Sequence, residues 1–328
     1  MLPALNRQLE KIMPLITPIS VLIGVLLGSH LSGFTFLSPW LFAFMTFSGS
    51  ISSSFREFVK VIVQPLPLIT TLLILHVGMP LVALGLGHAV YGHEPLTITG
   101  LILASAIPTG ITSFVWVAIY RGNIVLTLSI ILMDTILSPF VVPYTLSLLV
   151  GTKVQLDTLS MMKGLFFMIV VPSLIGMLLN QWTRGRVKEK WSGRLGPFSK
   201  LFMGIVVAIN SSVIAPYLRD FDMHLLGLAG FVLIIASLGY MIGWLVAKLF
   251  GWDQGTIVAL TFNGGMRNIS AGAVLAVAYF PPPVAIPVIL GMLFQQSLAS
   301  LFGFLLNRRY GLKNDAKRVN ISSNVKQA

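Results

Sequence analysis

Arg267 is the side chain of this sequence with the clearest chemical potential, because it lies deep inside an apolar segment of a largely apolar chain. An arginine at the middle of a membrane helix costs about 2.5–3.5 kcal/mol, so such residues face protein or a water-filled cavity and are usually functional. It belongs to the sequence Asn-Gly-Gly-Met-Arg-Asn at 263–268, whose glycines predict that the helix is interrupted. An interrupted helix with a buried charge is the usual construction of a transporter binding site.

A second interruption of the same kind is predicted at residues 108–113, which read Pro-Thr-Gly-Ile-Thr-Ser. Backbone groups freed at such a break must be buried in protein or line a cavity, and their dipoles can bind an anion or a cation. Two tolerated kinks in packed helices are the plainer alternative, but their matching positions in the two halves of the chain favour a central site. The residues of the two interruptions that we expect to bind substrate or ion are Thr109, Gly110, Thr112, Ser113, Asn263, Gly265, Arg267 and Asn268.

Asp134 is the acidic residue of the sequence that lies well inside an apolar segment. Charges inside a membrane usually pair, so we expect Asp134 to be either a counter-ion of Arg267 or a proton carrier; a third alternative is that the two do not touch. His76 is a second proton candidate, because histidine changes its charge near neutral pH. A lone histidine in a helix is more often a packed, hydrogen-bonded residue, and that alternative stays open.

The composition is that of a membrane protein. Of 328 residues, 55% are hydrophobic and 10% are charged, against about 25% charged in soluble domains. Cysteine is absent, which excludes disulfides and thiolate metal sites. The formal charge of +12 fits the basic cytoplasmic loops of membrane proteins better than nucleic-acid binding.

Ten apolar runs are long enough to cross a bilayer. They lie at about 13–31, 34–52, 62–86, 97–119, 123–150, 157–182, 198–217, 224–249, 254–279 and 283–307. With the N-terminus inside, eighteen Lys and Arg residues fall in inner segments, whereas the outer segments hold only Lys153 and Arg219. This bias follows the positive-inside rule, so we expect a multi-pass protein of the cell membrane with cytoplasmic N- and C-termini.

The ten spans divide into two sets of five, and an odd number of spans forces the two sets into opposite orientations. We therefore expect an all-α polytopic membrane protein built from two inverted five-helix repeats, with the interruption in the fourth span of each. Residues 1–182 would hold the first repeat and the sixth span, and 183–200 a basic cytoplasmic loop. Residues 201–309 would hold the rest of the second repeat, and 310–328 a cytoplasmic tail.

The sequence resembles the bile acid:sodium symporter family, also called the sodium bile acid symporter-like family. The resemblance is sharpest over 108–143 and 261–287, in Tyr-Arg-Gly-Asn at 120–123, Ser-Pro at 138–139, and Gly-Met with a following Asn at 265–268. It implies a panel domain and a core domain, broken helices four and nine that cross, and alternating access. It also implies organic anions as substrates, either bile acids or small carboxylates.

The sequence departs from the family at its sodium ligands. The ninth-helix motif Glu-x-Gly-Met-Gln-Asn has Asn263 in place of Glu and Arg267 in place of Gln. Apolar residues stand at further polar positions of the family: Leu75, Phe114 and Ile131. A hydroxyl remains one turn before the last of these, at Thr127, which we include among the binding residues. We expect at least one of the two sodium sites to be absent and favour the loss of both.

A guanidinium at the position of a sodium ion supplies a fixed positive charge, which would hold the broken helices together or attract a substrate carboxylate. We therefore expect a secondary active transporter of a small organic anion, with no catalytic residues, metal or cofactor, and with sodium sites altered or lost. The expected partners are the anion and the lipid bilayer; nucleic acid is not expected, and a homo-oligomer stays open.

Other functions remain as alternatives. They are an ordinary sodium:organic anion symporter, a carrier of a related fold such as an auxin efflux carrier-like or arsenite permease-like protein, and a channel. An intramembrane enzyme would need a nucleophile–base set or a metal cluster, and the apolar segments hold no such group of acids or histidines.

Overall fold

The computed structural model describes residues 15–52, 65–150, 157–219 and 222–311. Within these ranges the secondary structure is helical, and the only β-type pairing is an isolated bridge between Thr109 and Arg267. Seven helices of the described part are long and apolar enough to cross a membrane: Gly28–Ser50, Pro65–Tyr91, Ile124–Val150, Thr158–Trp182, Arg186–Val213, Met223–Leu249 and Pro282–Tyr310. Shorter apolar helices cover Leu15–Leu26, Pro95–Ala106 and Ile269–Tyr279. The chain is therefore a multi-pass membrane protein.

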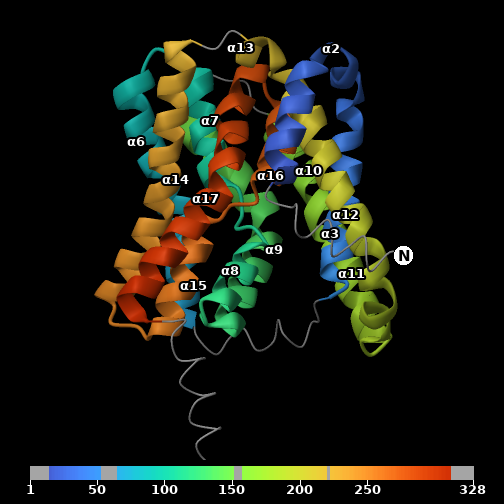
Figure 1. The fold of residues 1–328 in the computed structure, drawn as a ribbon, viewed down its shortest axis with the longest axis vertical. Helices are drawn as coiled ribbons and strands as arrows, with labels where there is room; N and C mark the ends of the chain where they lie inside the picture. The colour runs from blue at the N-terminus through green and yellow to red at the C-terminus, as the bar shows by residue number, and fades with distance from the viewer. Residues whose placement is uncertain (1–14, 53–64, 151–156, 220–221, 312–328) are drawn as a thin grey trace, which may run out of the picture.

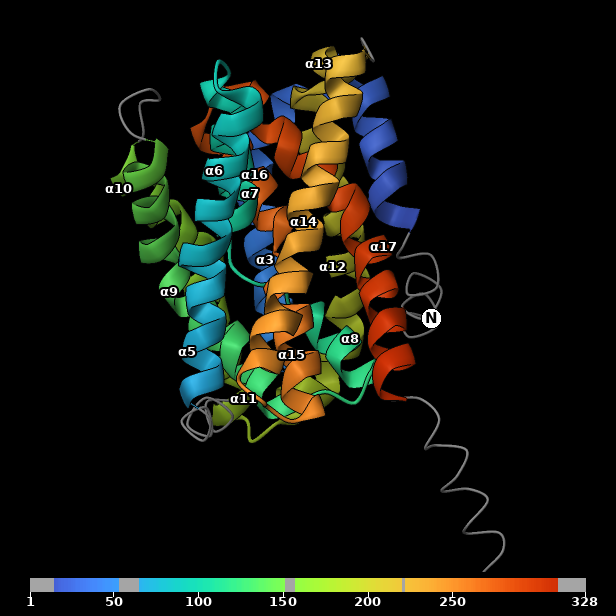
Figure 2. The same cartoon turned by 90° about the vertical axis from the view of Figure 1, so that its left-hand side faces the viewer.

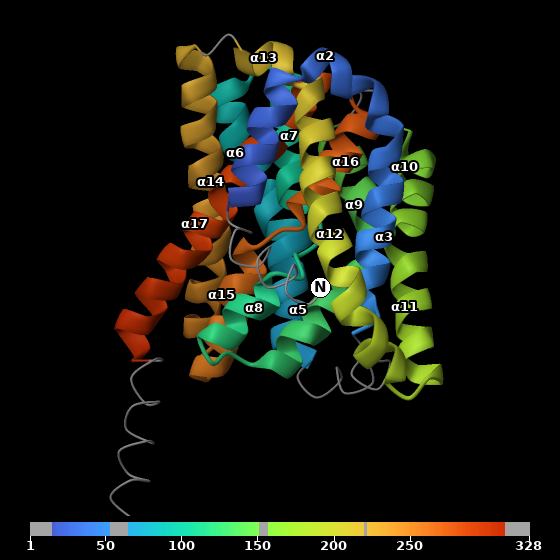
Figure 3. The same ribbon diagram turned by 45° about the vertical axis from the view of Figure 1, so that its right-hand side comes forward.

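The helices fall into two groups that lie side by side. In Figures 1 and 3, α14 and α17 stand on one side and α3, α11 and α12 on the other, with α7, α9 and α16 between them. Figure 2 shows the first group from its outer face, with α5, α6, α14 and α15 toward the viewer.

The elements of the first part of the chain are α2 (Gly28–Leu31), η1 (Ser32–Leu37), α3 (Ser38–Ser50), α5 (Pro65–Leu73), η3 (Ile74–Gly78), α6 (Met79–Tyr91), α7 (Pro95–Ala106), α8 (Ser113–Ile119) and α9 (Ile124–Val150). Those of the second part are α10 (Thr158–Leu165), η5 (Phe166–Val170), α11 (Val171–Trp182), α12 (Arg186–Val213), α13 (Ala215–Arg219), α14 (Met223–Leu249), α15 (Gln254–Gly265), α16 (Ile269–Tyr279), η6 (Pro282–Val284) and α17 (Ala285–Tyr310).

Two stretches of extended chain lie where the sequence predicts interruptions. The first extended segment, 107–110, is followed by a turn at 111–112 and separates α7 from α8, and the second, 266–268, separates α15 from α16. Pro108 has no N–H to donate and disfavours the helical conformation of the residue before it, and Ile107 is accordingly extended at φ −58° and ψ 149°. Met266 is extended after the two glycines, at φ −94° and ψ 105°. The side chain of Asn268 then caps α16 by accepting from the N–H of Ala271.

Two short π-helical stretches, η3 and η5, occur inside long helices. Each is followed by a proline at the start of the next helix, Pro80 in α6 and Pro172 in α11. The ring of a proline clashes with the carbonyl four residues earlier, and those carbonyls belong to His76 and Met168, inside the two stretches. Widening the helix relieves the clash, and π-bulges of this kind are frequent at functional sites.

The segment 183–200 differs from its expected form as a loop, because α12 is helical from Arg186 onward. Gly185, at φ +87°, makes the turn between α11 and α12, a backbone conformation that glycine adopts without steric cost. Lys, Arg and Glu are good helix formers, so the charges that suggest a loop also extend the helix beyond its apolar part.

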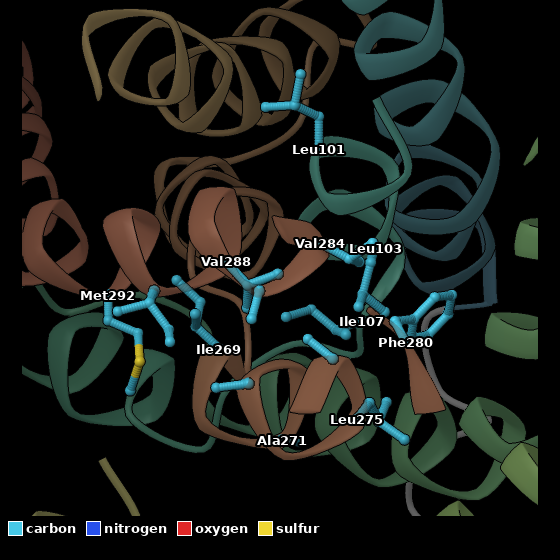
Figure 4. Close-up of a cluster of buried hydrophobic side chains, with 14 of the residues drawn as sticks. Leu101, Leu103, Ile107, Ile269, Ala271, Leu275, Phe280, Val284, Val288 and Met292 are labelled. Carbon is cyan, nitrogen blue, oxygen red and sulfur yellow. The ribbon is translucent and has the colours of Figure 1, made fainter. Parts of the chain in front are cut away.

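An apolar cluster fixes the ends of both extended segments. Figure 4 shows Leu103 of α7, Leu275 of α16 and Val288 of α17 in one group of side chains, with Leu101 farther along α7; all four are buried. The cluster also contains Ile107, the first residue of one extended segment, and Ile269, which follows the other. Burying a side chain of this size contributes about 1.5–3 kcal/mol, so the two extended segments are held between packed helices.

Helices α14 and α15 approach each other through glycines. A Cβ on Gly243 would lie 2.4 Å from the carbonyl oxygen of Leu260, and one on Gly239 would lie 2.8 Å from that of Gly264. Small residues at a helix contact let the backbones come close, which is a common way for membrane helices to pack. Because α15 ends at Gly265, this contact sets the position of the second extended segment.

We expect Gly243→Ala to destabilise the protein, because the added methyl meets backbone that cannot move aside. Overpacking of this kind costs about 1–3 kcal/mol. Thermal unfolding of the purified protein in detergent measures the effect. Gly230→Ala is the matched control in the same helix, since a Cβ there has nothing within 4 Å. Equal midpoints for the two variants would contradict the close contact.

Candidate functional site

The two extended segments are bonded to each other through their backbones. The N–H of Gly110 donates to the carbonyl of Met266 at 2.8 Å, and the N–H of Asn268 donates to the carbonyl of Pro108 at 2.7 Å. The hydroxyl of Thr109 also reaches the Met266 carbonyl, at 2.9 Å. Backbone groups outside a helix need such partners inside a membrane protein. Here each extended segment supplies hydrogen-bond partners for the backbone groups of the other.

Asn263 joins three elements around the bonded segments. Its Oδ1 accepts from the hydroxyl of Ser113 at 3.0 Å, and its Nδ2 donates to the hydroxyl of Thr127 at 3.2 Å. Its backbone carbonyl accepts from the Thr109 hydroxyl at 3.1 Å. Asn263 is fully buried, so these bonds replace water that cannot reach it, and they bring α8, α9 and α15 together at one point.

Arg267 is buried, 6% exposed, and only weakly bonded. Its Nη1 lies 3.5 Å from the carbonyl oxygen of Leu75 and 3.4 Å from that of Ile107, both long for a hydrogen bond, which is usually near 2.9–3.0 Å. Its Nη2 is buried without a hydrogen-bond partner in the described part of the chain. A guanidinium has five N–H donors, so this one retains donor capacity for an anion.

Asp134 bonds to His76 and to the first extended segment. Its Oδ1 lies 2.5 Å from Nε2 of His76, and its Oδ2 accepts from the N–H of Thr109 at 2.6 Å. Among the described residues its carboxylate makes an ion pair within 4.0 Å with His76 and none with Arg267. The two carboxylate oxygens are bonded to an imidazole and a backbone amide, so a counter-ion role of Asp134 toward Arg267 would act without a direct ion pair.

The remaining predicted residues have structural positions. Gly265 lies against Tyr240, where a Cβ would come 2.2 Å from the ring. A Cβ on Gly110 would lie 2.9 Å from the Arg267 carbonyl oxygen, so glycine permits the close approach of the two segments. Thr112 is half-buried and makes no capping bond at the start of α8. Asn268 caps α16, as described above.

A small cavity beside Arg267 has three further polar side chains that sequence reasoning missed. It is lined by Arg267, Ser105, Gln295 and Tyr240, and otherwise mostly by apolar side chains of α7, α14 and α17. The Oε1 of Gln295 is buried and unpartnered in the described structure, and the Tyr240 hydroxyl donates to the Gln295 carbonyl at 3.2 Å. The cavity of about 50 Å³ has room for a few water molecules, since one needs about 10–15 Å³ by this measure. An organic anion would require the site to open.

Bundled helices around a buried cation and two bonded extended segments define a membrane transporter, since buried charges beside irregular backbone are the construction of carrier sites. The chain belongs to the Sodium Bile acid symporter family, whose model matches residues 39–221. It is a transporter of that family and not an enzyme.

Relatives match along most of their length. The chain is 54% identical over 296 residues to the Bacillus subtilis "Uncharacterized protein YbaS". This alignment covers 90% of the chain and 97% of the relative. It is 26% identical to the Bacillus subtilis "Uncharacterized sodium-dependent transporter YocS", over 81% of this chain and 83% of the relative. It is 25% identical to the Oryza sativa subsp. japonica "Probable sodium/metabolite cotransporter BASS2, chloroplastic", and the alignment covers 87% of this chain and 69% of the relative.

We expect Asn263→Ala to lower the thermal unfolding midpoint, because it leaves the buried hydroxyls of Ser113 and Thr127 without this partner. A buried polar group that loses its partner costs about 1–3 kcal/mol. Ser237→Ala is the control, since that exposed hydroxyl bonds only within its own helix, to the Leu233 carbonyl. Equal stability of the two variants would show that Asn263 does not hold the three elements together.

Proposed function

We propose that this protein is a secondary active carrier of a small organic anion, either bile acid-like or a small carboxylate, that works by alternating access. In this proposal α7 with α8 and α15 with α16 are each one broken transmembrane helix, the fourth and the ninth of ten. The ten spans form two inverted five-helix repeats. The antiparallel pairing of the two extended segments supports this, because it is what two broken helices of opposite orientation would make.

The observation that carries the proposal is the state of Arg267. It is a buried cation with an unpartnered Nη2 beside a mostly apolar cavity. A positive charge of this kind needs an anion, and guanidinium binds carboxylates in a bidentate manner. Ligand sites typically combine an apolar lining with a few polar groups that fix orientation, so the cavity suits an anion with an apolar body.

The sodium sites that the family resemblance implies are depleted here. The positions of Leu75 and Ile131 hold buried apolar side chains that offer no oxygen. The carbonyl oxygens of Leu75 and Ile107, which a hard cation could use, face the Arg267 guanidinium instead. We infer that the guanidinium takes the place of one ion and ties the two extended segments to η3.

The charge pattern supports a cell-membrane location with both termini in the cytoplasm. The domain division stays as the sequence suggests it, with residues 1–182 and 201–309 on either side of the basic stretch at 183–200. The N-terminal residues 1–14 and the tail from 312 onward, both expected in the cytoplasm, lie outside the described residues.

Ordinary sodium-coupled transport is the second candidate. It is favoured by the names of two relatives, a "sodium-dependent transporter" and a "sodium/metabolite cotransporter". It differs from the first candidate in one measurable property, the response of uptake to a sodium gradient.

Uptake of labelled pyruvate, pantoate and taurocholate into proteoliposomes, with and without a sodium gradient, tests the proposal. We expect sodium-independent uptake of at least one probe, and a loss of about tenfold or more in Arg267→Gln. A hydrogen bond to a charged group contributes about 1.5–3 kcal/mol, and 1.4 kcal/mol is a factor of ten. The uptake rate of Arg267→Lys should fall between those of the wild type and Arg267→Gln, because lysine keeps the positive charge but lacks the planar guanidinium.

Arg194→Gln is the matched control for this experiment. It removes one positive charge from an exposed position on α12 and should leave uptake near the wild-type rate. Strong sodium-dependent uptake by the wild type would instead establish ordinary symport and contradict the replacement of sodium by Arg267.

A further inference from the structure

His76 and Asp134 form a buried titratable pair that anion binding at Arg267 does not use. The two side chains are 6% and 0% exposed. They come from η3 and α9 and are 58 positions apart in the sequence. Ionisable groups inside a membrane are costly, and they mark proton relays and ion pathways, so the pair requires a role.

The pair is connected to the anion site by two short paths. The carboxylate of Asp134 accepts from the N–H of Thr109, and Thr109 is bridged to Arg267. On the other side, the residue before His76 is Leu75, whose carbonyl faces the Arg267 guanidinium. A change in the charge of His76 therefore acts on both sides of the segment that holds the arginine.

The two ring nitrogens of His76 have different surroundings. Nε2 is bonded to Asp134, whereas Nδ1 is buried and has no hydrogen-bond partner in the described structure. A neutral ring that donates from Nε2 to an ionised carboxylate leaves Nδ1 as an unprotonated acceptor. A proton added at Nδ1 creates a second N–H donor, for which the described residues place no acceptor within reach.

This asymmetry links protonation to conformation. A buried donor without a partner costs about 1–3 kcal/mol, and the present arrangement offers a proton at Nδ1 no hydrogen bond. A conformation that brings water or a carbonyl to Nδ1 removes that cost and binds the proton more tightly. Two conformations that differ in proton affinity are shifted by proton binding, and the coupling between proton and conformation is reciprocal.

Few other charges face the ring. The elements in contact with η3 are α5, α6, α7, α9 and α14, and α5 and α7 contain no titratable residue. The titratable residues of the other three besides Asp134 are His88, Tyr91, Tyr144, His224, Tyr240 and Lys248. His224 is bonded to Glu94, Tyr240 to the Gln295 carbonyl, and His88 to a carbonyl of its own helix. Among the described residues, the titratable group bonded to His76 is Asp134, and the charged group nearest along the backbone contacts is Arg267, which faces the carbonyl of the neighbouring Leu75.

We propose that the His76–Asp134 pair is the binding site of a coupling proton that is carried together with the organic anion. This rests on the proposed function and names its coupling ion. The proton comes from water on one side of the membrane and forms an N–H bond at Nδ1 of His76. That bond breaks when the ring is exposed to water on the other side, and nothing is oxidised or reduced. One proton with one monovalent anion moves no net charge.

A titration without substrate tests the site itself. The wild-type protein, labelled with ¹⁵N-histidine and held in lipid nanodiscs, contains five histidines, and the signals of His76 are those missing from His76→Gln. We expect a second ring N–H signal, from Nδ1 of His76, to appear as the pH of the sample is lowered. A ring that shows no N–H at Nδ1 at any pH at which the protein stays folded overturns the proposal.

Uptake of the three probes named above then tests coupling, with rates corrected for protein-free liposomes. We expect an inside-alkaline gradient of one pH unit to raise wild-type uptake by up to about tenfold, since one unit is 1.36 kcal/mol. In His76→Gln, whose amide can still donate to Asp134, this stimulation should vanish. His88→Gln, at an exposed position, should retain it.

The outcomes separate the two proposals. Wild-type protein that transports none of the probes in any gradient contradicts the proposed function. Wild-type uptake that ignores the pH gradient, or stimulation that persists in His76→Gln, overturns the proton site and leaves the anion carrier standing. A folding defect of His76→Gln would not rescue the proposal, because wild-type uptake that ignores the pH gradient overturns it without any variant.

Discussion

The reciprocal backbone pairing of the two extended segments is the constraint on which the rest of the site depends. Inside a bilayer a free N–H or carbonyl has no water to bond, so neither segment could stay extended there without a bonding partner such as the other. The bonds of Gly110 to Met266 and of Asn268 to Pro108 close this requirement. They also fix Thr109 and Arg267 side by side, so the position of the buried cation follows from the position of the backbone.

The buried charges are arranged so that the cation remains available. A close Asp134–Arg267 pair would compensate both charges and leave the guanidinium with little to offer an anion. The carboxylate is instead bonded by His76 and the Thr109 amide, and the guanidinium faces carbonyl oxygens at long distances. Breaking a buried charge pair is strongly destabilising. If Asp134 were paired with Arg267, each binding of an anion would have to break that pair, and holding the two fixed charges apart avoids this cost.

Much of this organisation can be predicted from the residues, and the remainder cannot, for identifiable reasons. The apolar runs, the two breaks and the buried Arg267 follow from hydropathy, glycine and proline, which act locally. The partner of Asp134 does not, because it depends on how η3 turns toward α9. The Gln295 and Tyr240 side chains of the cavity carry no local signal either, since both lie within long apolar helices. The loop expected at 183–200 is wrong from Arg186 onward, where α12 is helical, because the charges that indicate a loop belong to residues with high helix propensity.

The π-helical stretch at η3 has a consequence for how such a site can arise. A π-bulge accommodates one residue more than the regular helix around it, and each residue turns a helix by about 100°. A single inserted residue that the helix did not absorb would therefore turn every later side chain of the helix by that angle. The bulge takes up the extra residue locally, so the position of His76 beside Asp134 is a matter of helical phase, and a one-residue change in length at η3 decides which side chain of this helix lies beside the carboxylate.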